Sequence, residues 1–399
     1  MREQGPNKLL FTHEQHVVEC GGRFYNPNPG GMIGYEALCN YLHTIPSAVV
    51  VLRCGHAEQA EEGWLRVDGE GIEVHPIPEF GSLGTMFRDL PRLVRALWTA
   101  IDRADRYVVR LPGPTGFLVA MFLLLRGRRY GVEMAGAYDE DLQKIIVERR
   151  LGPAWLGPAI DRLVGFAVRR AATVGYRSHY LRRRYPTFRR DREWVFSGAQ
   201  LSEEVITGAR PASAFTREPF RIASIGRIAV GKGYPLLVQA FARLRERVSV
   251  PLEMEIIGDG DELEKVRGEV ERSGLEEHVV LPGRLPWGDR LFGRLDRAHL
   301  FVLPSESDGM PRSLIEAMAR GMPVISTAVG GIPELVDSQY LVPPGDVETL
   351  VERIVPLIGN AAELAGMSRR SFERSKEHWP DVLDSAKRGF WRCVLRWAR

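Results

Sequence analysis

The sequence predicts an α/β protein made of two doubly wound parallel domains in tandem, and three observations lead to this prediction. Segments typical of buried strands alternate with segments of helical periodicity, which is the pattern of parallel sheets. The chain has 399 residues, about twice the usual size of one domain. A stretch rich in small residues and proline, at 206–219, separates two halves that are each long enough to bury a core.

The first half contains five segments that we expect to be strands. They are KLLFTH (8–13), AVVVLRC (48–54), RYVVRL (106–111), YGVEMAG (130–136) and TVGYRS (173–178), the last of which should close the series. The loop NPNPGG (26–31) precedes a segment of helical periodicity at 32–42. We therefore expect residues 1–205 to form the first domain.

The second half repeats this alternation. The expected strands are FRIASIGRI (220–228), LEMEIIGDG (252–260), HVVLPG (278–283), HLFVLPS (299–305) and PVISTA (323–328). An amphipathic helix is expected at 235–248 and a second one within 307–321. Residues 220–379 should form the second domain, with 206–219 as the linker.

Composition indicates a globular cytoplasmic protein. Apolar residues make up 44% and charged residues 26% of the chain, and the formal net charge is +3. The four cysteines show no metal-ligand or redox spacing, which fits free thiols in a reducing compartment. The N-terminus lacks the apolar core of a signal peptide. The longest apolar run, GFLVAMFLLL (116–125), is about half of what a membrane span needs and predicts a buried or an interfacial helix.

Two loops that follow expected strands carry the residues of greatest chemical interest, because open parallel sheets bind ligands beyond the carboxyl ends of their strands. The first loop contains Gly226-Arg227 and Lys232-Gly233, just before a helix. Glycines allow a close backbone approach, and a guanidinium and an ammonium near a helix N-terminus favour a diphosphate. Alone, this pattern is weak and is more typical of a basic surface loop.

The second loop, SDGMPRSLIEAMARG (307–321), makes the ligand interpretation stronger. Asp308 precedes the helix and Glu316 lies more than one turn inside it, so the two carboxylates can serve different parts of one ligand. Pro311 suits the first helical turn and Gly321 its end. A carboxylate on the helix can accept the two vicinal hydroxyls of a ribose. Together with the later pair Gly330-Gly331, the loops suit a sugar diphosphate.

Several motifs of the second half occur together in an order that resembles the donor domain of the retaining family-4 glycosyltransferases, which have the GT-B fold. The matching segments are IGRIAVGKGYPLLVQAF (225–241), IIGDGDE (256–262), VLPGRLP (280–286), LPSESDGMPRSLIEAMARGMPVISTAVGGIPELV (303–336) and YLVPPGD (340–346). The resemblance implies two Rossmann-like domains that face each other across a deep cleft. It also implies that residues 380–399 form a helix that crosses back to pack on the first domain.

The resemblance assigns roles to individual residues. Arg227 and Lys232 match the pair that holds the donor diphosphate, Glu316 matches the acid on the nucleotide ribose, and Asp308 occupies the place of the acid that faces the donor sugar. The loop 282–285 matches the loop beside the nucleobase. The other donor-binding candidates are Gly30, Gly31, Gly226, Gly233, Arg284, Leu285, Gly309, Met310, Pro311, Gly330, Gly331 and Glu334. The candidates on the acceptor side of the cleft are His13, Glu133 and Tyr138.

Three positions depart from the family pattern. Asp308 stands where the family usually has Glu, and Ala135 stands where it commonly has a His before a glycine. Ser197-Gly198 stands where the family usually has Asn-Gly after the last strand of the first domain. These departures bear on which sugar is accepted. They also keep open a nucleotide-sugar binding protein without transfer activity, or a sugar-nucleotide epimerase of the same fold.

The expected function is transfer of a sugar, with retention, from a UDP- or GDP-sugar to a glycan or a lipid-linked saccharide of a cell-surface polysaccharide or glycolipid. Fixed cations aimed at the diphosphate leaving group lower the barrier. Arg227, Lys232 and the loop amides would supply that charge, so no divalent metal and no other cofactor is expected. Asp308 then positions the donor and no protein nucleophile is required.

Three other motifs have plainer interpretations. Asp259-Gly-Asp261 resembles the metal-binding Asp-x-Asp of another fold but reads as a tight turn after a strand. His13-x-x-His16 follows a strand into a loop and lacks a third ligand, so an exposed or cleft-lining role is expected. Glu334 is placed equally well beside the donor or as a structural cap.

Residues 162–192 carry ten arginines and one acid, Asp191, among tyrosines, phenylalanines and leucines. A solvated helix face, anionic lipid headgroups, nucleic acid or an anionic glycan all fit such a segment. Given the resemblance, we expect peripheral contact with the inner face of the cell membrane and no nucleic acid partner. The segment 86–101, basic on one side and apolar on the other, supports this expectation modestly.

Overall fold

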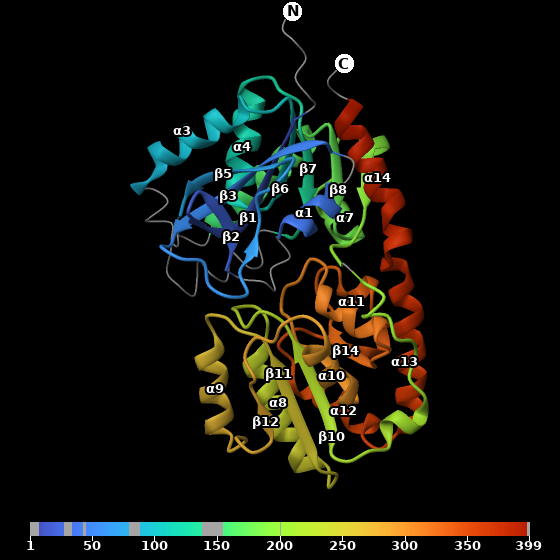
Figure 1. Cartoon of the computed structure of the whole chain (residues 1–399). Coiled ribbons are helices and arrows are strands. Elements are labelled where there is room, and N and C mark those ends of the chain that lie inside the picture. Colours follow the sequence, from blue (N-terminus) through green and yellow to red (C-terminus); the bar gives the residue numbers. More distant parts are fainter. Residues whose placement is uncertain are drawn as a thin grey trace, which may run out of the picture.

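The computed structural model describes residues 8–27, 34–42, 45–79, 88–137, 155–199 and 201–396, which form two domains placed one above the other (Figure 1). The first domain contains a nine-stranded sheet and the second a six-stranded sheet. The predicted α/β class with parallel sheets is confirmed. The first sheet ends at Val195 and the second begins at Phe220, so the predicted linker 206–219 falls between them.

Seven strands of the first domain form a parallel, doubly wound sheet in the order β5-β3-β1-β6-β7-β8-β9. β2 pairs antiparallel with the end of β1, and β4 pairs antiparallel with β2. The direction of winding reverses between β1 and β6. The strands are β1 (Lys8–Cys20), β2 (Arg23–Asn26), β3 (Ser47–His56), β4 (Leu65–Arg66), β5 (Ile72–Pro78), β6 (Arg106–Leu111), β7 (Gly131–Met134), β8 (Thr173–Tyr176) and β9 (Glu193–Val195).

Helices cover both faces of this sheet because its strands are apolar on both sides. Leu10 and Val109 pack into one core with α3, α4 and α6, whereas the neighbouring Leu9 and Val108 pack into a second core on the opposite face. The helices are α1 (Tyr35–Tyr41), α3 (Leu90–Ile101), α4 (Pro114–Leu125), α6 (Leu156–Arg170) and α7 (His179–Arg184).

The second domain has the strand order β12-β11-β10-β13-β14-β15, with all pairs parallel. Its winding reverses between β10 and β13. The strands are β10 (Phe220–Ile225), β11 (Leu252–Ile257), β12 (Val279–Val280), β13 (Leu300–Leu303), β14 (Val324–Thr327) and β15 (Leu341–Val342). The helices are α8 (Tyr234–Arg247), α9 (Leu263–Arg272), α10 (Asp289–Arg297), α11 (Arg312–Ala319), α12 (Val347–Ile354) and α13 (Ala361–Ser375). Short 3₁₀ helices lie at Arg190–Arg192, Ala212–Phe215, Ile332–Glu334, Ser338–Tyr340, Val355–Leu357 and Lys376–His378.

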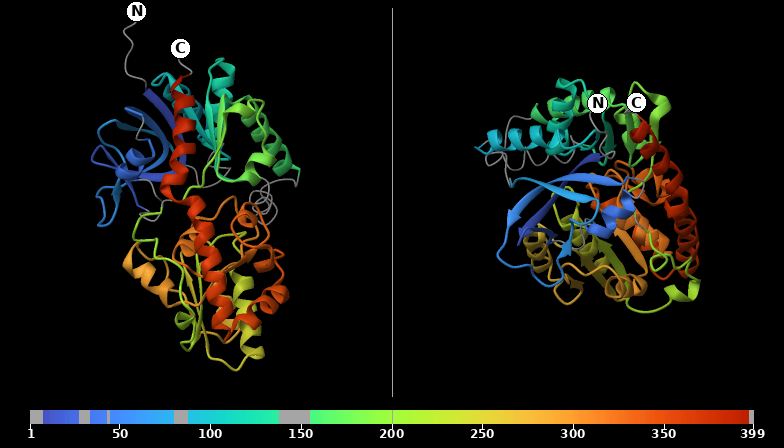
Figure 2. Two further views of the ribbon diagram at one scale, coloured as in Figure 1. Left: turned by 90° about the vertical axis from the view of Figure 1, so that its right-hand side faces the viewer. Right: turned by 45° about the horizontal axis from the view of Figure 1, so that its top comes forward.

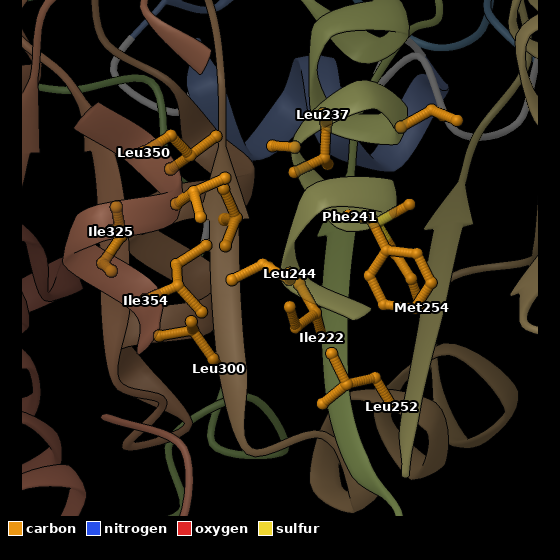
Figure 3. Packing of buried hydrophobic residues seen from close by; sticks show 14 of the residues in the cluster. Ile222, Leu237, Phe241, Leu244, Leu252, Met254, Leu300, Ile325, Leu350 and Ile354 are labelled. Atoms are coloured by element: carbon orange, nitrogen blue, oxygen red, sulfur yellow. The ribbon is translucent and has the colours of Figure 1, made fainter. Parts of the chain in front are cut away.

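One core of the second domain fills the space between the sheet and the helices α8 and α12 (Figure 3). Phe241 and Leu244 of α8 pack against Ile222 of β10 and Met254 of β11. This packing holds α8 against β10. Both ends of the loop that joins them are therefore held in place.

The last helix, α14 (Pro380–Arg396), runs back along the molecule to the first domain (Figures 1 and 2). Its buried residues Phe390 and Trp391 belong to the same core as Phe11 of β1 and Val108 of β6. The predicted return of the C-terminal helix is confirmed. It ties the two domains together on one side of the molecule.

Several details of the first domain differ from the expectation. β1 extends to Cys20 instead of ending near residue 13, with an irregular register between Thr12 and His16. The segment 173–178 does not close the series, because β9 pairs beyond it. β2, β4, β5 and β9, and β15 of the second domain, were not expected, because these segments are short or interrupted by polar residues and proline.

The apolar run 116–125 forms most of α4, and Val119, Ala120 and Leu123 lie in the core. The structure therefore supports the buried rather than the interfacial helix for this segment. Within the described ranges, no helix is both long and apolar enough to cross a membrane.

Candidate functional site

The reversal of winding in the second domain places two loops side by side. β10 and β13 are neighbours whose connections leave in opposite directions, so their carboxyl ends leave room for a ligand. Gly226 to Gly233 follow β10, and Pro304 to Pro311 follow β13. The residues that the sequence singled out thus meet at one edge of the sheet.

An ion pair joins the two loops. The Lys232 Nζ atom donates to Asp308 Oδ2 at 2.7 Å and approaches the Ser307 carbonyl oxygen at 3.4 Å. The two side chains are only 20% and 16% exposed. The charge of Lys232 is therefore balanced by a carboxylate of the neighbouring loop.

The glycine at 233 is required by the close approach of these loops. Its φ is +70°, and a Cβ atom there would lie 2.1 Å from the Pro304 carbonyl oxygen. The Glu306 amide also donates to the Gly231 carbonyl at 2.8 Å. Any side chain at 233 would force the two loops apart.

Arg227 is exposed, and within the described part of the chain no carboxylate forms an ion pair with it. Its loop is nevertheless ordered by the neighbouring turn, because the Ile228 amide donates to the Asp259 carbonyl at 2.9 Å. The Asp259 carboxylate accepts from the Gly260 amide at 2.8 Å. Asp259-Gly-Asp261 is therefore a turn that supports the Arg227 loop.

Glu316 lies on α11 next to Arg312 and has no side-chain hydrogen bond among the described residues. Burial raises the pKa of its carboxyl group from 4.5 to about 7, and the Arg312 guanidinium acts in the opposite direction. Burial also lowers the pKa of Arg312, to which Glu316 and Asp308 are close enough to oppose that shift. A carboxylate in this position gains most from hydroxyl donors, such as those of a ribose, because they stabilise its charged form.

The loop after β14 packs on the Asp308 loop and on the first domain. A Cβ atom at Gly330 would lie 1.7 Å from the Asp308 carbonyl oxygen, and one at Gly331 would lie 2.2 Å from the Gly309 carbonyl oxygen. At Gly309 it would lie 3.1 Å from the Ala135 carbonyl oxygen of the first domain. These glycines allow three backbone segments to meet at the domain interface.

Glu334 reaches across this interface. Its carboxylate accepts from the amide of His179 at 2.9 Å and from the amide of Tyr180, at the start of α7. Arg183 of α7 lies 3.6 Å from the same carboxylate. In this structure Glu334 caps a helix of the other domain, which matches the structural alternative for this residue.

The first domain presents an equivalent edge at its own reversal point. Polar residues lie on successive neighbouring strands, with His13 in the middle of β1, Arg110 and Glu133 near the carboxyl ends of β6 and β7, and Arg177 directly after β8. Arg110 and Glu133 are in direct register. The Glu133 side chain is fully buried, accepts from Tyr41 Oη at 2.7 Å, forms an ion pair with Arg177 and lies 3.9 Å from Arg110 Nε. Glu133 therefore holds the two arginines in place.

His13 is uncharged at neutral pH. Burial lowers the pKa of its imidazole well below the ordinary value, and Arg110 and Arg177 lower it further. The Nδ1 atom accepts from the Gln15 amide at 3.0 Å, so the proton of the neutral ring is on Nε2. His13 and His16 belong to β1 instead of a loop, and His16 Nε2 lies 3.0 Å from Glu79.

The remaining candidates are placed as follows. Gly30, Gly31 and Tyr138 lie outside the described residues. Arg284 is exposed after β12, Leu285 and Met310 pack partly on the core beneath α11, and Pro311 is buried directly before that helix. In the described ranges, no group of three or more His, Cys, Asp or Glu residues could hold a metal ion.

From the sequence, Arg110 and Arg312 had no assigned role, and Arg177 belonged only to the arginine-rich segment 162–192. The structure brings all three to this interface, where Arg177 is buried. Arg110 and Arg177 come from strands that are more than 60 residues apart, so no local motif contains both. The signal that could have found them is a charged residue at the carboxyl end of an otherwise apolar strand. RYVVRL and TVGYRS both show this signal.

Replacing Glu316 by Gln should stabilise the ligand-free protein at alkaline pH and change little in acid. The pKa of Glu316 is raised from 4.5 to about 7 in the folded state, so the unfolded state releases its proton first and stability falls as the pH rises between these values. The variant should gain on the order of 1–3 kcal/mol at about pH 8. Denaturant unfolding at about pH 8 and about pH 4.5 measures the difference.

The control for this prediction is Glu352→Gln, an exposed position on α12. It should change stability little at either pH. Equal stability of Glu316→Gln and the wild-type protein at both pH values would contradict the raised pKa.

Comparison with known proteins finds a family and a fold that the chain resembles. Residues 206–374 match the family model described as Glycosyl transferases group 1. HepE of Anabaena, whose structure was solved in complex with UDP and glucose, superposes with a TM-score of 0.67 over 97% of this chain and 99% of that one, at 18% sequence identity. This likeness shows the shared fold.

Two curated relatives are similar in sequence. The Escherichia coli protein "Putative colanic acid biosynthesis glycosyltransferase WcaL" is 35% identical over 175 residues, which is 41% of this chain and 42% of the relative. Protein CapJ of Staphylococcus aureus is 22% identical over 355 residues, or 87% of this chain and 85% of the relative. The match to WcaL thus spans less than half of that relative. Residues 206–374 thus resemble the group 1 glycosyl transferases, within a chain that has the two-domain GT-B fold.

Proposed function

We propose that this protein is a retaining glycosyltransferase that moves a sugar from a nucleoside diphosphate sugar to a glycan or a lipid-linked saccharide. The product belongs to a cell-surface polysaccharide or glycolipid. The observation that carries the proposal is the meeting of Lys232, Asp308 and Glu316 at the reversal point of the second sheet. HepE, which has the same fold and is 18% identical in sequence, was solved in complex with UDP and glucose. This supports a nucleotide sugar as the donor.

In this proposal each loop serves one part of the donor. Glu316 accepts the ribose hydroxyls, and Arg227 and Lys232 bind the diphosphate. When the diphosphate arrives, Lys232 exchanges Asp308 for a phosphate oxygen, which frees the Asp308 carboxylate for hydroxyls of the donor sugar. The position of Asp308, 2.7 Å from Lys232, makes this exchange local.

The chemistry follows from the charge that develops. Cleavage of the sugar–phosphate bond leaves an oxocarbenium-like sugar and a diphosphate, and fixed cations stabilise the leaving group. With retention, the acceptor attacks from the face that the diphosphate leaves, and a phosphate oxygen takes the acceptor proton. In this scheme no divalent metal is needed and no protein nucleophile forms a covalent bond.

The alternatives are a nucleotide-sugar binding protein without transfer and a sugar-nucleotide epimerase. The presence of both Arg227 and Lys232 favours transfer, because a protein that only binds the nucleotide sugar has less need for cations at the leaving group. Transfer releases a free nucleoside diphosphate only when an acceptor is present. An epimerase would convert the nucleotide sugar without an acceptor.

Lys232→Ala should weaken the binding of UDP or GDP roughly tenfold to a hundredfold, because a charge-assisted contact to a phosphate is worth about 1.5–3 kcal/mol. Calorimetric titration of the purified protein in EDTA measures this, and added magnesium should not change the affinity. The matched control is Lys265→Ala, an exposed lysine on α9 that pairs with Glu262. Unchanged nucleotide affinity in Lys232→Ala would refute the site assignment.

A surface of the first domain supports contact with an anionic membrane. The exposed residues of α6 fall on one helical face that mixes Arg162, Arg169 and Arg170 with Leu163 and Phe166. Phe188, in the loop after α7, is 75% exposed beside further arginines. Aromatic and basic side chains on one surface suit the headgroup region of anionic lipid. We place the protein at the cytoplasmic face of the membrane on this basis.

Flotation with vesicles that contain phosphatidylglycerol tests this contact. The wild-type protein should float at low salt, and Phe188→Asp should reduce the bound fraction several-fold because it replaces an apolar contact by a like charge. Val382→Asp is the control, since Val382 is exposed on α14 away from the arginine-rich segment. Absence of wild-type binding at low salt would remove the membrane from the proposal.

A further inference from the structure

The interface between the domains concentrates positive charge beside the acceptor side of the site. Arg110 and Arg177 come from the first sheet and Arg312 from α11, and we call these three residues the arginine cluster. Arg110 lowers the pKa of both Arg177 and Arg312, Arg312 lowers that of Arg177, and all three lower the pKa of His13. Burial is the largest cause of the lowered pKa of each guanidinium. Like charges are therefore held together in a poorly solvated place.

The carboxylates nearby neutralise only part of this charge. Glu133 is already engaged by Tyr41 and Arg177, and Glu14 by Thr115 and Arg53. Asp308 pairs with Lys232, and Glu316 is only partly ionised near pH 7 because of its burial. Among the described residues of this interface, the cations Arg53, Arg110, Arg177, Lys232 and Arg312 outnumber the carboxylates Glu14, Glu133, Asp308 and Glu316.

Two geometric facts indicate that the cluster awaits a ligand. Arg177 is only 8% exposed, and its Nε atom is buried without a hydrogen-bond partner among the described residues. Arg110 keeps 28% of its side chain exposed and lies 3.9 Å from Glu133, which is beyond a hydrogen bond. Buried guanidinium donors of this kind carry a desolvation cost that an oxyanion would offset.

We propose that Arg110 and Arg312, with Arg177 behind them, bind an oxyanion carried by the acceptor. Carboxylate and phosphate both match the planar fork of a guanidinium, so the acceptor is either an acidic sugar or a saccharide phosphate. The proposal rests on the proposed transferase function and adds the chemical class of its acceptor. The donor diphosphate is assigned to Arg227 and Lys232 on the other domain, so this oxyanion is a separate one.

The cluster would also select against neutral acceptors. A neutral sugar would not offset the desolvation of Arg110 and Arg312, and that cost falls on the wrong substrate only. Because Arg110 and Arg312 belong to different domains, an oxyanion between them would also hold the domains together around the donor.

The test is calorimetric titration of the full chain with sodium glucuronate, with inorganic phosphate and with glucose. It is run on the free protein and again with UDP or GDP at saturation. The wild-type protein should bind at least one of the two anions and not glucose, and the preferred anion tells a carboxylate acceptor from a phosphate acceptor. Arg110→Gln and Arg312→Gln should each weaken that binding tenfold or more, whereas Arg110→Lys should retain part of it.

Arg126→Gln is the matched control, since Arg126 pairs with Asp102 at the end of α4. It should bind the anion as the wild-type protein does. The proposal is overturned by equal anion affinity in Arg110→Gln, Arg312→Gln and wild type, by binding of neither anion, or by displacement of the anion when nucleotide saturates the donor site. Nucleotide affinity of the same variants is measured separately. If the wild-type protein bound no nucleotide, the transferase function would be refuted. Anion binding that depends on Arg110 would still be measured independently.

Discussion

Parallel strand pairing is the constraint on which the site depends. In a doubly wound sheet every strand delivers its carboxyl end to the same edge, and the reversal of winding leaves that edge open between two central strands. Here the reversal points lie between β1 and β6 and between β10 and β13. Arg110 lies near the carboxyl end of β6 and Asp308 follows β13, and α14 connects the two domains. The fold therefore brings together residues that are about 200 positions apart.

The charged side chains at this interface are placed so that the proposed ligands would balance their charges. Lys232 and Asp308 neutralise each other, and burial raises the pKa of Glu316 to about 7. In the proposed function, a nucleoside diphosphate would replace Asp308 at Lys232, and ribose hydroxyls would stabilise the ionised form of Glu316. The arginine cluster shows the same feature on the acceptor side, where buried cations exceed the carboxylates around them. A site of this kind is less stable alone than when it is occupied, which is the expected relation between stability and binding.

The sequence predicted the second domain more fully than the first, and the reason is physical. Lys232, Asp308 and Glu316 lie in loops whose glycines and prolines are local signals, so the strand, the loop and the helix can be read from one segment. The arginine cluster has no such segment, because long-range strand pairing creates it. β5 contains two prolines and β9 has three residues, so neither carries a clear strand pattern. The interdomain contact of Glu334 with α7 likewise depends on how the domains meet, which no local pattern encodes.

The most direct measurement is a crystal structure of the protein with the tightest-binding nucleoside diphosphate, grown without divalent metal. We expect the ribose hydroxyls to contact Glu316 and the diphosphate to lie beside Arg227 and Lys232. We also expect Lys232 to contact a phosphate oxygen in place of Asp308. A nucleotide bound elsewhere, or a diphosphate seated on Arg110 and Arg177 with the Lys232–Asp308 pair intact, would contradict it.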